Sequence, residues 1–141
     1  MWNKTHSKIY KNVSKEAVWK IWKDINNYAN WHDDLDYCQL KGEFAKGNYF
    51  LLKPKGGPKV KVWLLDIKEN ESFLDCTRFF GAKMYDLHSL EDTSEGLKIS
   101  NTITVKGPLA FLWTKLVAKD VAAHAPQEMD AVVDLARGSH G

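Results

Sequence analysis

The sequence predicts an α+β domain in which a curved antiparallel sheet packs against one long C-terminal helix. Two observations carry this prediction. Apolar alternation with a period of two, interrupted by short turn signals, runs from about residue 36 to residue 106. A broad apolar stripe with helical spacing follows, from about residue 108 to residue 137. A sheet and a helix that each have one apolar side bury those sides against each other.

The first predicted elements are a strand and a helix. Residues 5–10 alternate weakly, which is typical of an edge strand. Ser14 is a good helix N-cap, and the segment SKEAVWKIWKDI that it opens has apolar residues at spacings of three and four. Asn26 and Asn27 end this helix, and the segment YANW indicates one further short helical turn.

Six further strands follow, joined by short connections that are rich in turn residues. We expect them at about 36–42, 47–55, 58–67, 72–80, 83–91 and 96–106. Consecutive strands with short connections pair antiparallel as a meander. The last strand alternates most clearly, and its apolar face carries Leu97, Ile99, Ile103 and Val105. Asn101 is the one polar residue on that face.

The terminal helix has two features that bear on function. Gly107 breaks the last strand, Pro108 suits the first helical position, and Pro126 predicts a kink or a break further on. Small residues lie along the middle of the helix, at Ala118, Ala122, Ala123 and Ala125. Small residues there predict space between helix and sheet, and space lined with large apolar side chains is a pocket.

Length and composition indicate one domain, over residues 1–137, with residues 138–141 as a tail. The net charge of +2 gives no overall electrostatic reason to expect nucleic acid or an anionic membrane as a partner. No apolar run is long enough to span a membrane, and the N-terminus lacks the apolar core of a signal peptide. Cys38 and Cys76 form no CxxC motif. We therefore expect a cytoplasmic monomer or weak homodimer without cofactor, metal, nucleic-acid partner or membrane insertion.

Four stretches carry a resemblance to a known superfamily. They are VSKEAVWKIWKDINNYANWH, LKGEFAKGNYFLLKPKGGP, FGAKMYDLHSLEDTSEGLKISNTITVKGPLAFLW and the terminal amphipathic helix. The first ends just past Trp31, and the second contains Gly42, Phe44 and Gly47 in a GxFxxG pattern. Over about residues 3–136 the chain resembles the START-related superfamily, also called SRPBCC or polyketide cyclase/dehydrase and lipid transport.

This resemblance implies the helix-grip fold, with about seven strands wrapped around the long C-terminal helix and two short helices after the first strand. It leaves function open, because the superfamily includes lipid carriers, aromatic cyclases and hormone receptors. The leading hypothesis is binding of a small hydrophobic or amphipathic molecule, lipid-like or polyketide-like, between sheet and helix. A cyclase/dehydrase-type enzyme and a protein-interaction module are the alternatives. The expected ligand-binding residues are Trp31, His32, Trp63, Met84, His88, Asn101, Trp113 and Leu116.

The later strands supply the candidates for polar chemistry. Asp86 and His88 are two residues apart, so both project from one face of a strand. With Asn101 on the neighbouring strand, they would orient a ligand hydroxyl or carbonyl, or act as catalytic residues with His88 as general base. A register slip of one residue would turn Asp86 and His88 to solvent and put Tyr85 and Leu87 in the pocket instead.

Four other polar features have a plainer interpretation. Arg78 and His124 are each expected at the surface or facing a ligand. The acidic residues after His32 are Asp33, Asp34 and Asp36. Adjacent residues point in different directions, so they do not make a defined metal site, and we expect a surface loop there. The lysines of LLKPKGGPKVK lack the spacing of a phosphate-binding loop. We expect a solvated hairpin tip there, with weak contact to an anionic surface as the alternative.

Overall fold

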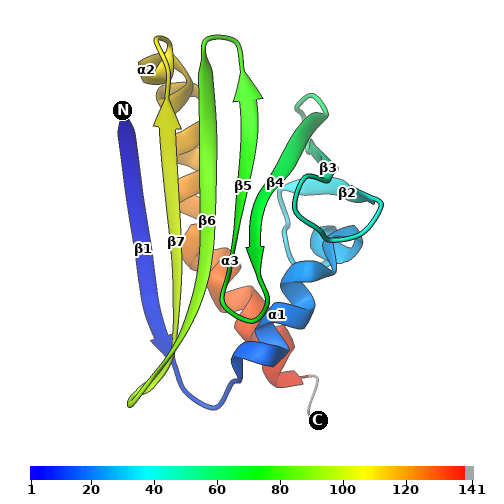
Figure 1. Ribbon diagram of the computed structural model, residues 1–141, viewed down its shortest axis with the longest axis vertical. Coiled ribbons are helices and arrows are strands. Elements are labelled where there is room, and N and C mark those ends of the chain that lie inside the picture. Colours follow the sequence, from blue (N-terminus) through cyan, green and yellow to red (C-terminus); the bar gives the residue numbers. More distant parts are fainter. Residues whose placement is uncertain (139–141) are drawn as a thin grey trace.

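Seven antiparallel strands form one curved sheet in the computed structural model, which describes residues 1–138 (Figure 1). The strand order across the sheet is β1-β7-β6-β5-β4-β3-β2. The strands are β1 (Trp2–Tyr10), β2 (Leu35–Lys41), β3 (Tyr49–Pro54), β4 (Val60–Lys68), β5 (Ser72–Phe79), β6 (Ala82–Thr93) and β7 (Gly96–Lys106). All neighbours pair antiparallel, so strands β2 to β7 form the expected meander and β1 is added at its edge.

Two short helices connect β1 to β2. Helix α1 spans Lys15–Lys23, and the Ser14 side chain accepts a hydrogen bond from the backbone N–H of Ala17 at 3.1 Å, as the N-cap prediction requires. The 3-10 helix η1 spans Ile25–Asn30. These elements and the sheet confirm the predicted α+β class and the helix-grip arrangement.

Three consecutive helical segments make up the terminal helix: α2 (Ala110–Trp113), the π-helical turn η2 (Thr114–Ala118) and α3 (Lys119–Gly138). The prediction of a break at Pro126 is not met, since α3 continues through this residue and the departure from α geometry lies earlier, at η2. Gly138, the first residue of the predicted tail, ends α3, and residues 139–141 lie outside the described part of the chain. Within residues 1–138, no helix is long and apolar enough to cross a bilayer.

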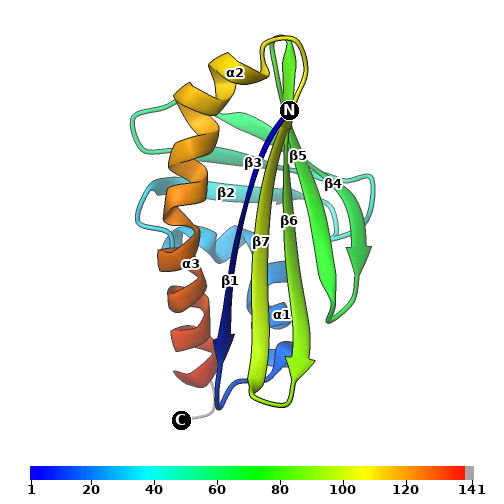
Figure 2. The ribbon, with the colours of Figure 1, turned by 90° about the vertical axis from the view of Figure 1, so that its left-hand side faces the viewer.

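The terminal helix runs along one face of the sheet, which we call the inner face (Figure 2). In Figure 1, helix α1 lies at the lower end of the molecule near the turn between β4 and β5, and η1 follows above it, in contact with β2. One apolar cluster lies at this lower end and contains Val18, Trp19, Trp22, Phe73, Ile99 and Val132, among others. These residues come from α1, β5, β7 and α3, so the cluster joins the two halves of the chain.

A second apolar cluster lies where α2, η2 and the start of α3 meet β6 and β7. Its buried members are Ala82, Met84, Ile103, Val105, Ala110, Ala118 and Ala122. The small residues on the helix therefore do not leave space here as expected: they let the helix backbone pack directly on the strands. The larger residues Leu112 and Leu116, which share the helical spacing, remain exposed.

Candidate functional site

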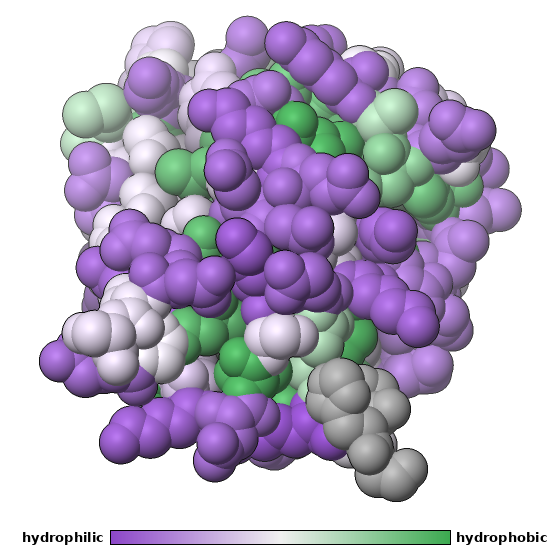
Figure 3. Space-filling view, turned by 60° about the horizontal axis from the view of Figure 1, so that its bottom comes forward, coloured by the Kyte–Doolittle hydropathy of each residue, from purple (hydrophilic) through white to green (hydrophobic). Residues whose placement is uncertain are grey.

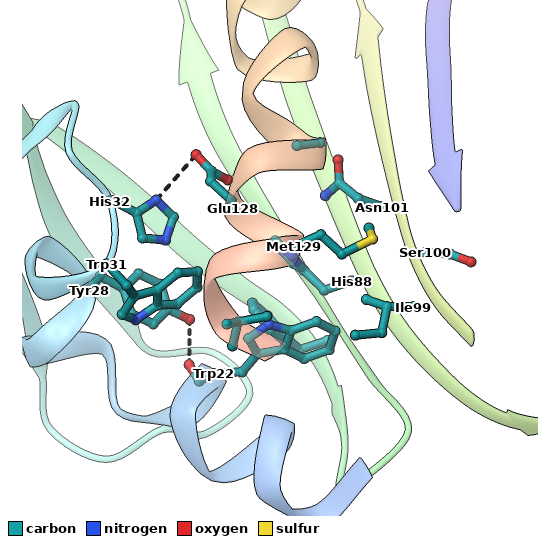
Figure 4. Close-up of a pocket in the computed structure, with 13 residues that line it drawn as sticks. Trp22, Tyr28, Trp31, His32, His88, Ile99, Ser100, Asn101, Glu128 and Met129 are labelled. Carbon is teal, nitrogen blue, oxygen red and sulfur yellow. Dashed lines mark hydrogen bonds and ion pairs between the residues drawn. The ribbon is translucent and has the colours of Figure 1, made fainter. Parts of the chain in front are cut away.

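A pocket of about 50 Å³ lies between the inner face of the sheet, η1 and α3 (Figure 4). It is lined by Trp22, Tyr28, Trp31, His32, Phe73, His88, Ile99, Ser100, Asn101, Ala125, Glu128, Met129 and Val132. A single water needs about 10–15 Å³ of void. In this conformation the pocket therefore admits only a few water-sized groups, and its walls are mainly aromatic and aliphatic.

Four polar side chains from three neighbouring strands meet at one wall of this pocket. His88 Nε2 lies 3.2 Å from Asp75 Oδ2 and 3.3 Å from Asp86 Oδ1. The Asn101 side-chain amide donates to Asp86 Oδ1 at 2.5 Å. The sheet register explains this convergence, because Asp75 is opposite Asp86 and His88 is opposite Asn101. We call these four residues the polar cluster; His88 and Asn101 line the pocket, and the two carboxylates lie behind them.

Burial and mutual contact shift the proton affinities within the polar cluster. Burial raises the pKa of Asp86 to about 7, although the charge on His88 opposes this. Burial also raises the pKa of Asp75. For His88, burial lowers the pKa, but the carboxylates of Asp86 and Asp75 outweigh this effect and raise it to about 9. His88 is therefore an imidazolium near neutral pH, with a nitrogen–hydrogen donor directed between the two carboxylates.

Aromatic rings enclose the imidazole. The ring of His88 stacks on Phe73 with centroids 4.1 Å apart and planes 14° apart. Trp22 presents an edge to the same imidazole at 5.6 Å. A cation held between rings and carboxylates is favoured by both, so the enclosure is consistent with a protonated His88.

The rim of the pocket is made by the chain after η1 and by α3 (Figure 4). His32 Nδ1 lies 3.2 Å from Glu128 Oε1, and the Gln127 amide donates to the Asp33 carboxylate at 3.1 Å. Trp31 Nε1 and His32 Nε2 are buried and have no hydrogen-bond partner among the described residues. A movement of this rim away from α3 would break two polar contacts and would give these two nitrogens access to water or to a ligand.

Five of the residues singled out by sequence lie at this pocket. Trp31, His32, His88 and Asn101 line it, and Asp86 lies behind His88. The alternative register is not observed: Asp86 and His88 point to the inner face. Tyr85 and Leu87 therefore lie on the outer face.

Four other expected ligand contacts lie elsewhere and are corrected. Trp63 is on the outer face, under the Arg78 guanidinium at 5.3 Å, because Val62 and Leu64 occupy the inner face of β4. Met84 packs in the second apolar cluster.

Trp113 and Leu116 miss the pocket because the terminal helix turns its small residues to the sheet. Trp113 stacks on Phe79 at 4.5 Å, and its indole N–H donates to the Phe80 carbonyl oxygen at 2.7 Å. Leu116 is 59% exposed. Of the remaining polar candidates, Arg78 is exposed on the outer face, and His124 donates to the Asp120 carbonyl oxygen at 2.7 Å along the helix surface.

Two groups bring three potential cation ligands within 4.8 Å of one another: His32, Asp34 and Glu128 at the rim, and Asp75, Asp86 and His88 in the polar cluster. In both groups the imidazole nitrogen already faces a carboxylate at hydrogen-bonding distance. Ion pairing between imidazole and carboxylate therefore accounts for the closeness of the side chains in both groups.

Asp75 and Glu128 are the charged residues of the site that sequence reasoning missed. Asp75 alternates with Phe73 and Thr77 on one face of β5, but apolar residues on both faces hide this signal. Glu128 lies three residues after Ala125 and four after His124, within the apolar stripe of the helix. A lone carboxylate in such a stripe is the signal that was available for it.

Comparisons with known proteins define the fold and go no further. Neither a protein-family model nor a curated protein matches the sequence. Among solved structures, a hypothetical protein from Helicobacter pylori matches with a TM-score of 0.77 and 12% identity over 96% of this chain and 88% of that one. The di-domain ARO/CYC StfQ from the steffimycin biosynthetic pathway matches at 0.78 and 8%, over 99% of this chain and 51% of that one. Ara h 8.0201 matches at 0.70 and 14%, over 96% and 98%.

At such low identities these likenesses concern the fold alone. The chain has the helix-grip fold that these structures share. Because this fold carries different functions, what the chain does has to be argued from its own pocket.

Proposed function

We propose that the chain binds a small amphipathic molecule, lipid-like or polyketide-like, in the pocket between sheet and α3. The apolar part of the ligand would lie against Trp22, Phe73 and Met129, and its polar group would meet His88 and Asn101. The observation that carries this proposal is the polar cluster on the wall of an otherwise apolar pocket. Two buried carboxylates cost stability in a core that needs only packing, whereas a few polar groups among apolar walls are typical of ligand sites.

A ligand larger than a few atoms requires the pocket to widen. The ion pair that joins the rim to α3 is a weak attachment, because the Glu128 side chain is 32% exposed and partly exposed ion pairs contribute little stability. Separation of Trp31 and His32 from α3 would enlarge the pocket without disturbing the sheet. The likeness to a di-domain ARO/CYC supports a ligand of polyketide size.

Displacement of an environment-sensitive dye by a panel of fatty acids and polycyclic aromatic compounds tests this proposal. Ala125 lines the pocket, so Ala125→Leu should fill it and lower affinity for dye and ligand at least tenfold. Ala123→Leu adds the same side chain at an exposed position of the same helix and should leave affinity unchanged. Thermal unfolding of both variants would show that they are folded. No dye binding by the wild type, or equal loss in both variants, would contradict the proposal.

A second candidate function, proton transfer in a cyclase-type reaction, is favoured by one observation, the position of His88 between two carboxylates. With a pKa of about 9 and its ring on the pocket wall, His88 is suited to donate a proton to a ligand carbonyl, so that water can take the proton from the neighbouring carbon, while Asp75 and Asp86 behind the imidazole hold it in place. NMR would follow deuterium exchange at the acidic carbon of a bound β-diketone. Catalysed exchange that His88→Gln abolishes while binding persists supports this function; exchange at the rate of the free compound excludes it.

A further inference from the structure

Large apolar side chains are exposed together at one end of the molecule. Phe80, in the turn between β5 and β6, is 84% exposed, and Phe111, in α2, is 73% exposed. Leu112 and Leu116 of the same helical stretch are also exposed. The two segments meet, because the Trp113 indole donates to the Phe80 carbonyl oxygen. Figures 1 and 2 both show α2 beside the end of the β5–β6 hairpin. We call Phe80, Phe111, Leu112 and Leu116 the apolar tip.

A row of three basic residues adjoins the apolar tip on the outer face. Arg78 is directly opposite Lys83, and Lys83 is directly opposite Lys106, across β5, β6 and β7. All three are exposed, and no ion pair with a carboxylate of residues 1–138 neutralises any of them. Like charges directly opposite each other destabilise a sheet, so an external partner that neutralises them would gain affinity.

Other segments of the chain are also basic. The segments 55–61, 78–83 and 106–119 contain no Asp or Glu, and their charged residues are Lys55, Lys59, Lys61, Arg78, Lys83, Lys106, Lys115 and Lys119. Since the whole chain has a net charge of only +2, the remainder is acidic on balance. The balanced composition therefore conceals strongly basic segments.

We infer that this end of the molecule docks on an anionic membrane surface. Phe80 and Phe111 would enter the boundary between headgroups and acyl chains, and the row of Arg78, Lys83 and Lys106 would lie on the headgroup phosphates. Peripheral membrane binding needs an apolar surface and a basic one side by side, and both are present here.

A membrane fits this surface better than nucleic acid does. Leu112 and Leu116 cannot stack on bases as aromatic rings do, whereas aliphatic and aromatic side chains both partition into a bilayer. Figure 3, which looks onto the opposite end, shows a mostly hydrophilic surface with apolar groups set among polar ones. Among residues 1–138, the apolar tip and the row of Arg78, Lys83 and Lys106 thus lie together at the end away from this view.

Co-sedimentation with vesicles tests the docking surface. We expect the protein to bind vesicles that contain phosphatidylserine, to bind pure phosphatidylcholine vesicles much more weakly, and to release as salt is raised. Each basic residue at such a surface adds about fivefold to affinity, so Arg78→Gln/Lys83→Gln/Lys106→Gln should bind about a hundredfold more weakly. Phe80→Ser/Phe111→Ser should lose about tenfold or more.

A charge-matched control separates position from net charge. Lys11, Lys20 and Lys23 are exposed near α1, at the opposite end, so their triple replacement by Gln removes the same charge. This control should bind vesicles within about twofold of the wild type, because its charges lie beyond the screening length from the membrane.

A labelling experiment gives an answer that does not depend on loss of binding. Cys38 and Cys76 are buried, so a fluorophore attached to a Phe80→Cys variant reports one site. Its emission should shift to the blue with phosphatidylserine vesicles, while a label on Lys20→Cys should not shift. No vesicle binding, equal loss in both triple variants, or binding only to a short RNA would overturn the inference.

Discussion

The stability of the protein should fall by about 3 kcal/mol as His88 loses its proton. The rise of its pKa from 6.5 to about 9 on folding corresponds to this free energy, since each tenfold change in proton affinity is worth about 1.4 kcal/mol. Because the folded state binds the proton more tightly than the unfolded state, the stabilisation is complete below about pH 6.5 and is lost as the pH rises through about 9. About 2 kcal/mol of it should be lost between pH 7 and pH 9.

Asp86 acts in the same direction at lower pH. Its pKa of about 7 in the folded protein means that ionisation lowers stability between about pH 4 and pH 7. Above about pH 7 the further loss of stability therefore comes mainly from His88, with a smaller contribution near pH 9 from the buried thiols of Cys38 and Cys76, whose pKa values burial also raises. Urea unfolding followed by circular dichroism gives the free energy at each pH, and nitrogen NMR of the imidazole gives the pKa directly.

The control for this prediction is Asp75→Asn. It removes one of the two carboxylates that face His88 Nε2, so the pKa of His88 should fall and the loss of stability should begin at lower pH. An imidazole that titrates below pH 6.5 in the wild type, or a stability that is flat between pH 7 and pH 9, would refute the reasoning. His124 lies on the helix surface and can be assigned separately by its own substitution.

Three further predictions concern the rim, the backbone and the core. Glu128→Gln removes the charge facing His32 and should change the free energy of unfolding by less than about 1 kcal/mol. The dye should enter this variant faster in stopped-flow measurements, and an unchanged rate would argue against entry at the rim. Gly107→Ala should lower the free energy of unfolding, measured with urea, more than Gly47→Ala does. The added Cβ at Gly107 (φ +123°) would lie 2.6 Å from a backbone oxygen, whereas the space at Gly47 (φ +93°) is open. The reverse order would contradict this reasoning. Leu64→Ala should cost about 2–5 kcal/mol by the same measurement, because Leu64 is fully buried; a loss below about 1 kcal/mol would mean that the site can collapse.

The bounds and orientation of a strand could be predicted from the sequence where one face of the strand is consistently apolar. The last strand has the expected bounds, Gly96–Lys106, and Ile99 and Ile103 place Asn101 on the inner face with them. Register on such a strand is set by burial, because a slip of one residue would expose the whole apolar set.

The sequence did not determine which face of the sheet carries the side chains of the polar cluster. Strand β6 has apolar residues on both faces, with Met84 on one and Leu87 on the other, so its own pattern allows both orientations of His88. Pairing with β5 and β7 decides between them, and a strand does not contain its neighbours' pattern. Asp75 was missed for the same reason.

The terminal helix shows a different limit of pattern reasoning. The large residues Leu112 and Leu116 and the small residues Ala118 and Ala122 form two stripes, both with helical spacing. Close packing on the sheet selects the small ones, because they let the backbones approach. Periodicity locates a stripe but does not say how near the partner lies.

The π-helical turn η2 fixes how α2 is rotated relative to α3, and it does so through the number of residues in the turn rather than through their side chains. A π turn holds one residue more than an α turn, so the helix after it is out of phase by about 100° with the helix before it. Deletion of one residue between 114 and 118 would restore a continuous α-helix. Either Glu128 and Met129 would then rotate off the pocket, or Phe111 would rotate off its present surface. A deletion variant that folds would therefore show whether the pocket or the apolar tip keeps its present geometry when the other is lost.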